Sequence, residues 1–390
     1  MASGLTCLGV LVRYWGMDFD LFVYGTIGRR AELEAGKAGL RNDLYQRMLG
    51  ELADLVETAD AAGYSTLGHP EHHLQVEGFE IINDPCAMSM YLGQFRKQMN
   101  ILTCGFVSTT HNPLRVAENI ATLDHMHRGK FSVGLVRGYQ ARWVDNFKLK
   151  DNVGPVGPWN KNSDEDETNR RYFEEYVDIV YTALLNETFS HEGEFWKFPN
   201  LDKNPHPHDV YSKYGVGVED DMTVTETGIA PRPFQTPHPK IYSGFTGSAR
   251  TAGFWGRYGG KSIVLGGGPD LLKAIWKAYD DTAAEYGRTV LPGEQACWGG
   301  FMICAETDEE AQAQLEDCKW FFDSWSVPFG QPMARLLVGS PDTITREIEA
   351  ATEIVPINEI MLLIPQGIHG PEQLNPSIEL FAEKVMPRFT

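Results

Sequence analysis

The sequence lacks paired cysteine motifs and long apolar segments. Its six cysteines are scattered, and no two of them stand in the C-x-x-C spacing of structural zinc sites and thiol redox centres. They fit no disulfide framework either, so we expect reduced thiols. No apolar run approaches the roughly 20 residues that cross a bilayer, and the chain does not begin with a basic stretch followed by an apolar one. We therefore expect a cytoplasmic protein without a membrane anchor.

Positive charge is also scarce. The chain has 34 lysines and arginines against 53 aspartates and glutamates, which gives a formal net charge of -19. A surface of this sign repels the phosphates of nucleic acids and the headgroups of anionic lipids. Neither nucleic acid nor a membrane is therefore an expected partner.

What the sequence does contain is an alternation of short β-type runs with amphipathic helical stretches. Eight runs have strand character: Asp18–Tyr24, Tyr64–Leu67, Asn100–Val107, Phe131–Val136, Lys240–Ser243, Ser262–Leu265, Trp298–Cys304 and Glu359–Ile364. Between them, apolar residues recur at helical spacing, as Leu44, Met48 and Leu52 do. This alternation is typical of βαβ units with a parallel sheet. Eight strands with intervening helices predict an α/β fold of the (β/α)8 TIM-barrel class.

A doubly wound sheet is the alternative fold. The first strand-to-helix turn, Gly25–Gly28, does not have the spaced glycines of a dinucleotide-binding fingerprint, which favours the barrel. Asn112-Pro113 and Asn375-Pro376 each combine an N-cap residue with a proline suited to a first helical turn. We therefore expect a helix to begin at each of them.

Two stretches interrupt the alternation. Residues 138–168 and 200–238 are rich in proline, glycine, asparagine and aspartate, and they far exceed the connections of about 2–6 residues that are usual in α/β units. Loops of this length commonly form lids or binding loops, so we expect both to be ordered over one end of the barrel. We interpret residues 17–390 as a single barrel domain with these two insertions, preceded by an extension at residues 1–16.

The motif GHPEHH at residues 68–73 follows the second predicted strand. In a barrel this position lies at the C-terminal mouth, where the strand ends converge on the active site. His69-Pro70-Glu71, followed by Pro85-Cys86, is similar to a zinc-deaminase signature, but Ser89 stands where the second cysteine belongs. Pro70 also prevents a helix that would align two histidines on one face. A polar strand end satisfied by its neighbours is the plain alternative. We interpret Glu71, His72 and His73 as proton-handling groups beside a bound ligand, and we predict no metal.

Three longer segments, together with Glu71-His72-His73, carry a family resemblance. They are HNPLRVAENIATLDHMHRGKFSVGLVRGYQ at His111–Gln140, GFTGSARTAGFWGRYG at Gly244–Gly259, and PSIELFAEKVMPRF near the C-terminus. The chain resembles the bacterial luciferase-like superfamily of flavin-dependent monooxygenases from about Asp18 to Phe389. The resemblance implies a TIM barrel that binds FMN at its C-terminal mouth, a separate reductase that delivers reduced flavin, and a homodimer.

The resemblance also implies the residues of a flavin site. His72 matches the family's catalytic histidine, with Glu71 or His73 orienting its ring. The flavin ring packs beside a non-proline cis peptide, and arginines together with a helix start hold the phosphate. The residues assigned to the cofactor on this basis are Cys104, Gly105, Arg137, Tyr139, Arg170, Gly247, Ser248 and Thr251, with Arg171 as the alternative to Arg170. A surface ion pair is the plain alternative for Arg137.

Some positions depart from the luciferase pattern. Val136 replaces a reactive cysteine, Gly266 replaces a tryptophan, and the second insertion carries His206, His208 and Tyr211. These differences concern the substrate pocket, so light emission is not inferred. The implied activity is the oxygenation of a small organic substrate, by hydroxylation or Baeyer–Villiger-type insertion. In it, reduced FMN and O₂ form a C4a-(hydro)peroxyflavin that the two long loops shield from water.

Two other functions stay open. The same superfamily contains enzymes that use the deazaflavin F420 for hydride transfer without oxygen. It also contains non-catalytic subunits that bind flavin or support a homologous catalytic chain. Retention of His72, Arg137 and Ser248 together argues against the second alternative.

Met17 is an expected native start, because family members typically begin a residue or two before the first strand. A chain that begins at Met17 should fold and bind flavin as the full chain does. Expression of both forms and flavin titration test this expectation. Loss of solubility or of flavin affinity on truncation would rule it out.

Overall fold

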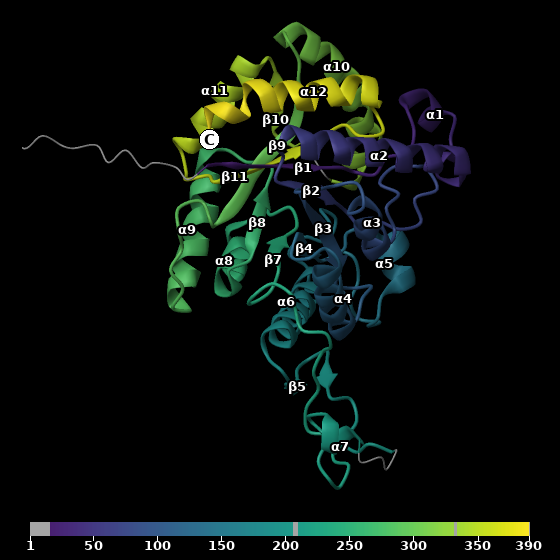
Figure 1. Ribbon diagram of the computed structural model, residues 1–390, viewed down its shortest axis with the longest axis vertical. Helices are drawn as coiled ribbons and strands as arrows, with labels where there is room; N and C mark the ends of the chain where they lie inside the picture. The colour runs from purple at the N-terminus through teal and green to yellow at the C-terminus, as the bar shows by residue number, and fades with distance from the viewer. Residues whose placement is uncertain (1–15, 206–209, 331–333, 390) are drawn as a thin grey trace, which may run out of the picture.

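The computed structural model describes residues 16–205, 210–330 and 334–389, which form a barrel of parallel strands surrounded by helices (Figure 1). In these residues eight strands pair in chain order around the barrel: β1 (Asp18–Phe22), β2 (Thr66–His69), β3 (Asn100–Val107), β4 (Phe131–Val136), β7 (Lys240–Ser243), β8 (Lys261–Val264), β9 (Ala296–Cys304) and β11 (Glu359–Leu363). The ring closes because β9 pairs with both β8 and β11, and β11 pairs with β1. The predicted TIM barrel is confirmed.

The strands lie where the sequence predicts them, with ends displaced by at most two residues. One strand of the same sheet has no counterpart in the prediction: β10 (Leu336–Gly339) pairs with Phe301–Cys304, beyond the part of β9 that pairs with β8. A separate antiparallel pair consists of β5 (His191–Glu192) and β6 (Lys197–Phe198).

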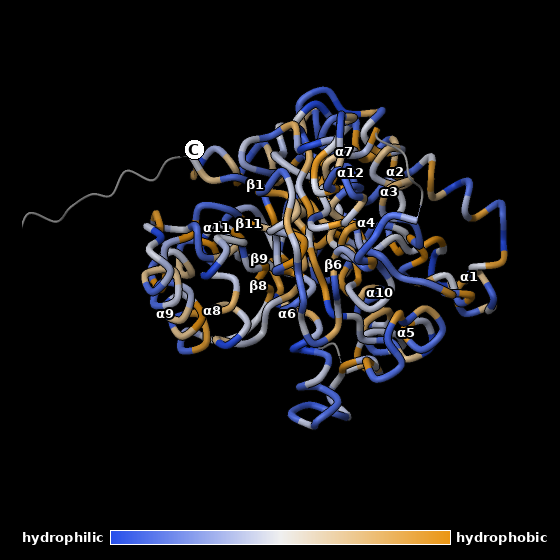
Figure 2. The backbone as a smooth tube through the Cα atoms, turned by 90° about the horizontal axis from the view of Figure 1, so that it is seen from below, coloured by the Kyte–Doolittle hydropathy of each residue, from blue (hydrophilic) through white to orange (hydrophobic). Residues whose placement is uncertain are grey.

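Helices surround the barrel and occupy the longer connections. They are α1 (Arg30–Glu34), α2 (Asn42–Ala62), α3 (Pro85–Leu92), α4 (Pro113–Met126), α5 (Ala141–Phe147), α6 (Asp164–Leu185), α7 (Val210–Tyr214), α8 (Ala249–Tyr258), α9 (Pro269–Glu285), α10 (Asp308–Phe321), α11 (Pro341–Thr352) and α12 (Pro371–Lys384). A π-helical segment, Phe322–Ser326, continues α10, and 3-10 turns lie at Ala38–Leu40, Val327–Phe329 and Met386–Arg388. Figure 2 shows apolar residues gathered along the strands in the middle of the molecule. In the described part of the chain, no helix is both long and apolar enough to cross a membrane.

One of the two predicted helix starts is confirmed. Asn112 caps α4, because its side chain accepts hydrogen bonds from two first-turn backbone N–H groups. The start predicted at Asn375-Pro376 is wrong, since α12 begins at Pro371 and encloses both residues. Leu374 belongs to the buried face of α12. Its packing favours a helix that begins before Asn375-Pro376.

The two long insertions lie at opposite ends of the barrel. Residues 138–168 connect β4 to α6, and they therefore begin at the carboxyl end of a strand, as expected for a cover of the mouth. Residues 200–238 connect α6 to β7, and a helix-to-strand connection lies at the other end. The expectation that the second insertion also covers the mouth is wrong, because the direction of the chain places it at the amino ends of the strands.

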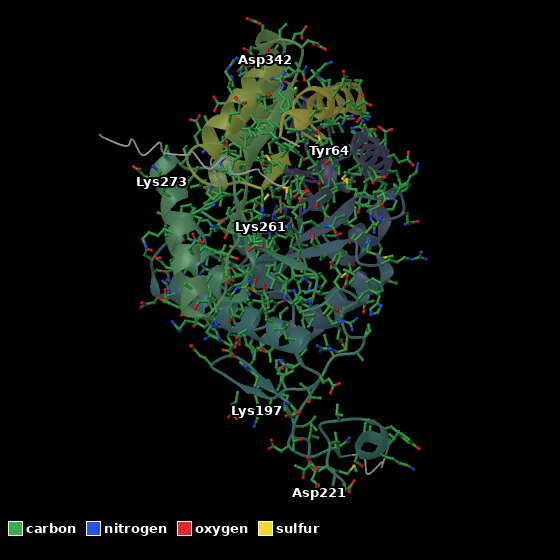
Figure 3. The ribbon with its side chains drawn as sticks, turned by 60° about the vertical axis from the view of Figure 1, so that its left-hand side comes forward. Tyr64, Lys197, Asp221, Lys261, Lys273 and Asp342 are labelled. Carbon is green, nitrogen blue, oxygen red and sulfur yellow. The ribbon has the colours of Figure 1, made fainter. Side chains whose placement is uncertain are left out.

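This second insertion belongs to an arm that extends from the barrel. Figure 3 labels Lys197 and Asp221 along the arm, which also carries α7. Tyr211 is part of α7, whereas His206 and His208 lie outside the described residues.

Charged residues meet inside the barrel at the amino ends of its strands, where Asp20, Lys261 and Glu359 are buried and Lys240 is partly exposed. Glu359 forms ion pairs with Lys240 and with Lys261 (Nζ to Oε2, 2.8 Å), and it accepts a hydrogen bond of 2.6 Å from the Tyr242 hydroxyl. Burial alone would raise the pKa of Glu359, but the two ammonium groups hold it well below its usual range. Burial and repulsion from Glu359 raise the pKa of the neighbouring Asp20.

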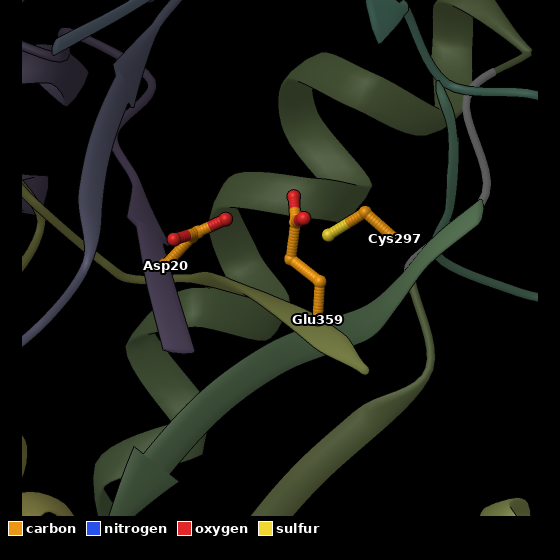
Figure 4. Close-up of side chains that lie close together, drawn as sticks. All are labelled: Asp20, Cys297 and Glu359. Carbon is orange, nitrogen blue, oxygen red and sulfur yellow. The ribbon is translucent and has the colours of Figure 1, made fainter. Parts of the chain in front are cut away.

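Asp20, Cys297 and Glu359 each place a ligand atom within 4.8 Å of the others, as Figure 4 illustrates. Metal ligands must be deprotonated. Burial raises the pKa of both the Cys297 thiol and the Asp20 carboxyl, and Glu359 is already neutralised by lysines. We therefore interpret the cluster as an ion-pair group that stabilises the closed barrel.

Replacing Glu359 tests this interpretation. Glu359→Gln leaves the buried Lys261 ammonium without a counter-charge, and breaking a buried pair in this way costs about 3–5 kcal/mol. The midpoint of urea unfolding at neutral pH should fall accordingly, whereas Glu349→Gln on the exposed face of α11 should leave it unchanged. Equal midpoints for the two variants would show that the cluster does not stabilise the barrel.

Candidate active site

A cavity of about 540 Å³ opens at the carboxyl ends of the barrel strands. Most of its wall is aromatic or aliphatic and includes Phe22, Tyr24, Val107, Leu135, Trp143, Val156, Phe245, Leu265 and Phe322. Among the described residues that line it, the acidic and basic side chains are Glu71, His72, Glu80 and Arg137. The cavity therefore suits a ligand that is mostly apolar and carries a few polar or charged groups.

Glu71 is a buried carboxylate that binds two imidazoles. Its Oε1 lies 2.8 Å from Nε2 of His73 and 2.9 Å from Nε2 of His111. Burial alone would raise the pKa of Glu71, but the bonds to His111 and His73 lower it, so Glu71 is ionised. Glu71 and His73 are bonded to each other, and neither is hydrogen-bonded to Nδ1 of His72, so the idea that one of them orients His72 stays a prediction.

His72 lies in the cavity wall apart from that group. Its ring packs edge-on against Tyr139 and Trp143, with ring centres 5.7 and 6.4 Å away. Its Nδ1 is buried without a hydrogen-bond partner among the described residues. A carboxylate oxygen, Oε2 of Glu80, lies 3.7 Å from this nitrogen. His72 is thus an imidazole that faces the ligand space without being bound by another side chain.

Sequence reasoning missed two residues of this site. His111 directly precedes the predicted helix start at Asn112, so the rule that strand ends meet at the mouth would have found it. Glu80 stands in the loop between β2 and α3 without any motif around it. It meets His72 only through the path of that loop.

Strands β3 and β4 approach each other closely in the cavity wall. The peptide bond between Cys104 and Gly105 is cis, as predicted. A Cβ atom on Gly105 would lie 2.3 Å from the carbonyl oxygen of Gly134, so this position accommodates glycine alone. Burial raises the pKa of the Cys104 thiol to about 12, so the thiol is protonated and is not a nucleophile. The result is a stretch of bare backbone against which a flat ring can lie.

The start of α8 forms a polar end of the cavity. Ser248 is the N-cap: its Oγ accepts a hydrogen bond of 3.3 Å from Thr251 N and lies 3.0 Å from the Thr251 hydroxyl oxygen. Gly247 and Thr251 line the cavity, and a Cβ atom on Gly247 would meet nothing within 4 Å. Free backbone N–H groups and the helix dipole make such a start suitable for an anion.

Arg137, directly after β4, also lines the cavity. Its Nε donates a hydrogen bond of 2.8 Å to Asn169 Oδ1, and its Nη2 donates one of 2.7 Å to Asp166 Oδ1. With 19% of its side chain exposed, it is not a surface ion pair. These bonds hold the guanidinium in place, and Nη1 is the group left for a ligand.

The neighbouring arginines of α6 differ in their surroundings. Arg170 is 16% exposed, and its Nε is buried without a hydrogen-bond partner among the described residues, with Oε2 of Glu167 3.9 Å away. Arg171 is 45% exposed and forms an ion pair of 2.9 Å with Glu194 on the surface. Arg170, not Arg171, therefore has the unsatisfied donor that a phosphate would bind.

The structure brings most of the predicted cofactor residues together. Those that line the cavity are Cys104, Gly105, Arg137, Tyr139, Gly247 and Thr251. Ser248 and Arg170 are not in the lining. Val136 and Gly266, the two departures from the luciferase pattern, both are, which agrees with an altered ligand pocket.

Comparison with known proteins gives one family. A family model described as luciferase-like monooxygenase matches residues 26–335. The chain is 28% identical over 269 residues to limonene 1,2-monooxygenase from Rhodococcus erythropolis. The aligned region covers 67% of this chain and 57% of that protein. It is 22% identical over 325 residues to 3,6-diketocamphane 1,6-monooxygenase from Pseudomonas putida, covering 76% and 80%. The chain thus spans about half the length of the first of these relatives and more of the second.

Solved structures show the same fold. The FMN-bound oxygenating constituent of 3,6-diketocamphane monooxygenase from Pseudomonas putida superposes with a TM-score of 0.71, at 18% identity, over 96% of this chain and 99% of that one. An F420-dependent secondary alcohol dehydrogenase superposes with a TM-score of 0.62, at 14% identity, over 96% and 100%. At these identities the likeness concerns the barrel and not the choice of cofactor.

The two arginines of α6 provide a matched test of the polar end. If Arg170 binds the phosphate of FMN, reduced FMN should bind more tightly than reduced riboflavin, and Arg170→Met should remove about ten- to a hundredfold of that preference, since a charge-assisted contact contributes about 1.5–3 kcal/mol. Arg171→Met should leave the preference unchanged. Anaerobic titration of the three proteins measures it, and an equal effect of both variants would contradict the assignment.

Proposed function

Because the chain belongs to the luciferase-like monooxygenase family, we propose that it uses reduced FMN and O₂ to oxygenate a small, mostly apolar organic molecule. The observation that carries the proposal is the cavity at the barrel mouth. It combines an unbound imidazole, His72, with a bare backbone wall and an anion-binding end. We propose hydroxylation or Baeyer–Villiger-type insertion as the outcome, and the names of the two relatives above support an alkene or a ketone as substrate.

The residues present fit FMN. Its flat ring would lie along Cys104-Gly105, where a side chain is excluded, and its phosphate would lie at the start of α8. The orphaned, buried Nε of Arg170 and Nη1 of Arg137 supply positive charge there. Reduced FMN, when bound, would supply the electron pair that activates O₂.

The chain's own part in the reaction is to manage protons and water. His72 can hold or deliver a proton at the ligand, because its ring lines the cavity and an imidazole nitrogen can accept or donate a proton. Water is kept out by Trp143 and Val156 from the first insertion, and by the segment after α10 that contributes Phe322 and Ser326.

An F420-dependent oxidoreductase is the second candidate, because two of the similar solved structures are named as F420-dependent enzymes. A non-catalytic flavin-binding partner subunit is the third. F420-dependent oxidation would proceed without oxygen, whereas the proposed reaction needs both O₂ and reduced FMN. A subunit without catalytic function would form no product under either condition.

We further propose that a separate reductase supplies the reduced flavin and that the chain acts as a homodimer in the cytoplasm. The family resemblance supports the first two statements. The cysteines in the described residues are free thiols, which supports a reducing compartment.

Replacing His72 tests the proposed function. His72→Ala should keep the fold and most of the affinity for reduced FMN, and should lower the product formed per reduced flavin by about a hundredfold or more, as expected for a positioned acid or base. The O₂ that the variant consumes should instead be released as hydrogen peroxide. Single-turnover reactions with a panel of cyclic ketones and alkenes measure both products.

His73→Ala serves as the comparison, because it removes a partner of Glu71 and leaves His72 in the cavity. His73→Ala should lower the thermal midpoint of unfolding, and it should keep most of the product yield that His72→Ala loses. An unchanged product yield in His72→Ala would contradict the catalytic role of His72.

A further inference from the structure

We propose that Glu80 is a positioning residue that orients His72 for proton transfer; this inference rests on the proposed function. Glu80 lines the cavity, its side chain is 8% exposed, and it is a negatively charged neighbour of His72. The other buried carboxylate of the site, Glu71, is hydrogen-bonded to His73 and His111 instead. The site thus contains two buried carboxylates with separate sets of partners.

Two hydrogen bonds fix the position of the Glu80 carboxylate. Its Oε2 accepts one of 3.0 Å from the Tyr139 hydroxyl and one of 3.0 Å from Nε1 of Trp325. Burial and the nearby Glu80 raise the pKa of Tyr139 well above its usual value, so the phenol keeps its proton and donates it. Nε2 of Gln140 donates to the same phenol oxygen at 2.8 Å, which directs the phenol proton towards Glu80.

The distance between His72 and Glu80 is slightly longer than a hydrogen bond, and a small movement would close it. Nδ1 of His72 lies 3.7 Å from the oxygen that Tyr139 and Trp325 hold in place, slightly beyond a hydrogen bond. This nitrogen is buried and has no other partner among the described residues. Catalytic hydrogen bonds are often long in the free enzyme and shorten when the ligand binds. With Nδ1 turned towards Glu80, the opposite nitrogen of His72 is turned towards the ligand space.

The backbone at Glu80 and at Trp325 is unusual in both cases. Glu80 has φ of 49°, a left-handed conformation that side chains other than glycine rarely adopt and that is concentrated at functional sites. The next residue is anchored, because Ile81 N donates to the Gly25 carbonyl at 2.8 Å. Trp325 belongs to the π-helical segment Phe322–Ser326, and such segments are frequent at functional sites. Two connecting loops and a π-helical segment thus meet at one carboxylate oxygen.

The competing explanation is that Glu80 only ties the segment after α10 to the barrel. Glu80→Gln separates the two roles, because the amide oxygen can still accept hydrogen bonds from Tyr139 and Trp325 but carries no charge towards His72. We expect its product yield per reduced flavin to fall about tenfold or more. Its thermal midpoint and its affinity for reduced FMN should match those of the unmodified protein. Glu80→Asp should recover part of the yield.

Trp325→Phe keeps the ring and removes one of the two donors to Glu80, so it should also lower the product yield. Trp320→Phe is the matched control, because that indole packs against Phe79 and Arg30, whereas it is Trp325 that donates to Glu80. If Glu80→Gln does not fold, a lower yield in Trp325→Phe than in Trp320→Phe supports the proposal, and equal yields overturn it. If Glu80→Gln folds, a normal yield overturns it. His72→Ala, assayed alongside, distinguishes the two failures: a normal yield there overturns the proposed function itself.

Discussion

The complete ring of parallel strands is the constraint on which the rest of the structure depends. Because β9 pairs with both β8 and β11, all eight strands point the same way around a closed barrel, and their carboxyl ends share one rim. His72, Cys104, Arg137 and Ser248 lie in or follow four different strands and meet only through this closure.

Charge is distributed unequally between the two ends of the barrel. At the amino ends, Glu359 forms ion pairs with Lys240 and Lys261, so these charged groups are paired with one another. At the carboxyl ends the wall is mostly apolar, and Arg170 and His72 each keep a buried nitrogen without a hydrogen-bond partner among the described residues. Unsatisfied buried donors are costly unless a ligand binds them, so the mouth is the end prepared for a ligand.

Much of the fold could be predicted from the sequence. Parallel strands buried on both faces appear as short apolar runs, and the helices that cover them have apolar residues at helical spacing. The eight barrel strands are of this kind, whereas the helix start at Asn112 followed from the chemistry of its N-cap. The second insertion was misplaced, because composition shows that a loop is long but not at which end of the barrel it lies. The order of strand and helix does show this: residues 200–238 follow a helix.

The candidate site was predictable only in part. Its position followed from strand ends, and the cis peptide at Cys104-Gly105 from the family resemblance. The partners of the charged groups did not follow, because they depend on loop paths: Glu71 binds His111 across the mouth, and Glu80 approaches His72 from a loop without a motif. The choice between Arg170 and Arg171 likewise needed the exposed fraction of each side chain.

The crystal structure of the complex with FMN is the most direct measurement of whether this cavity is a flavin site. We expect the flavin ring to lie along Cys104-Gly105 beside His72, with the phosphate at the start of α8 and within hydrogen-bond distance of the Arg170 guanidinium. FMN bound outside the barrel mouth, or bound with its phosphate towards Glu80, would contradict the arrangement described above.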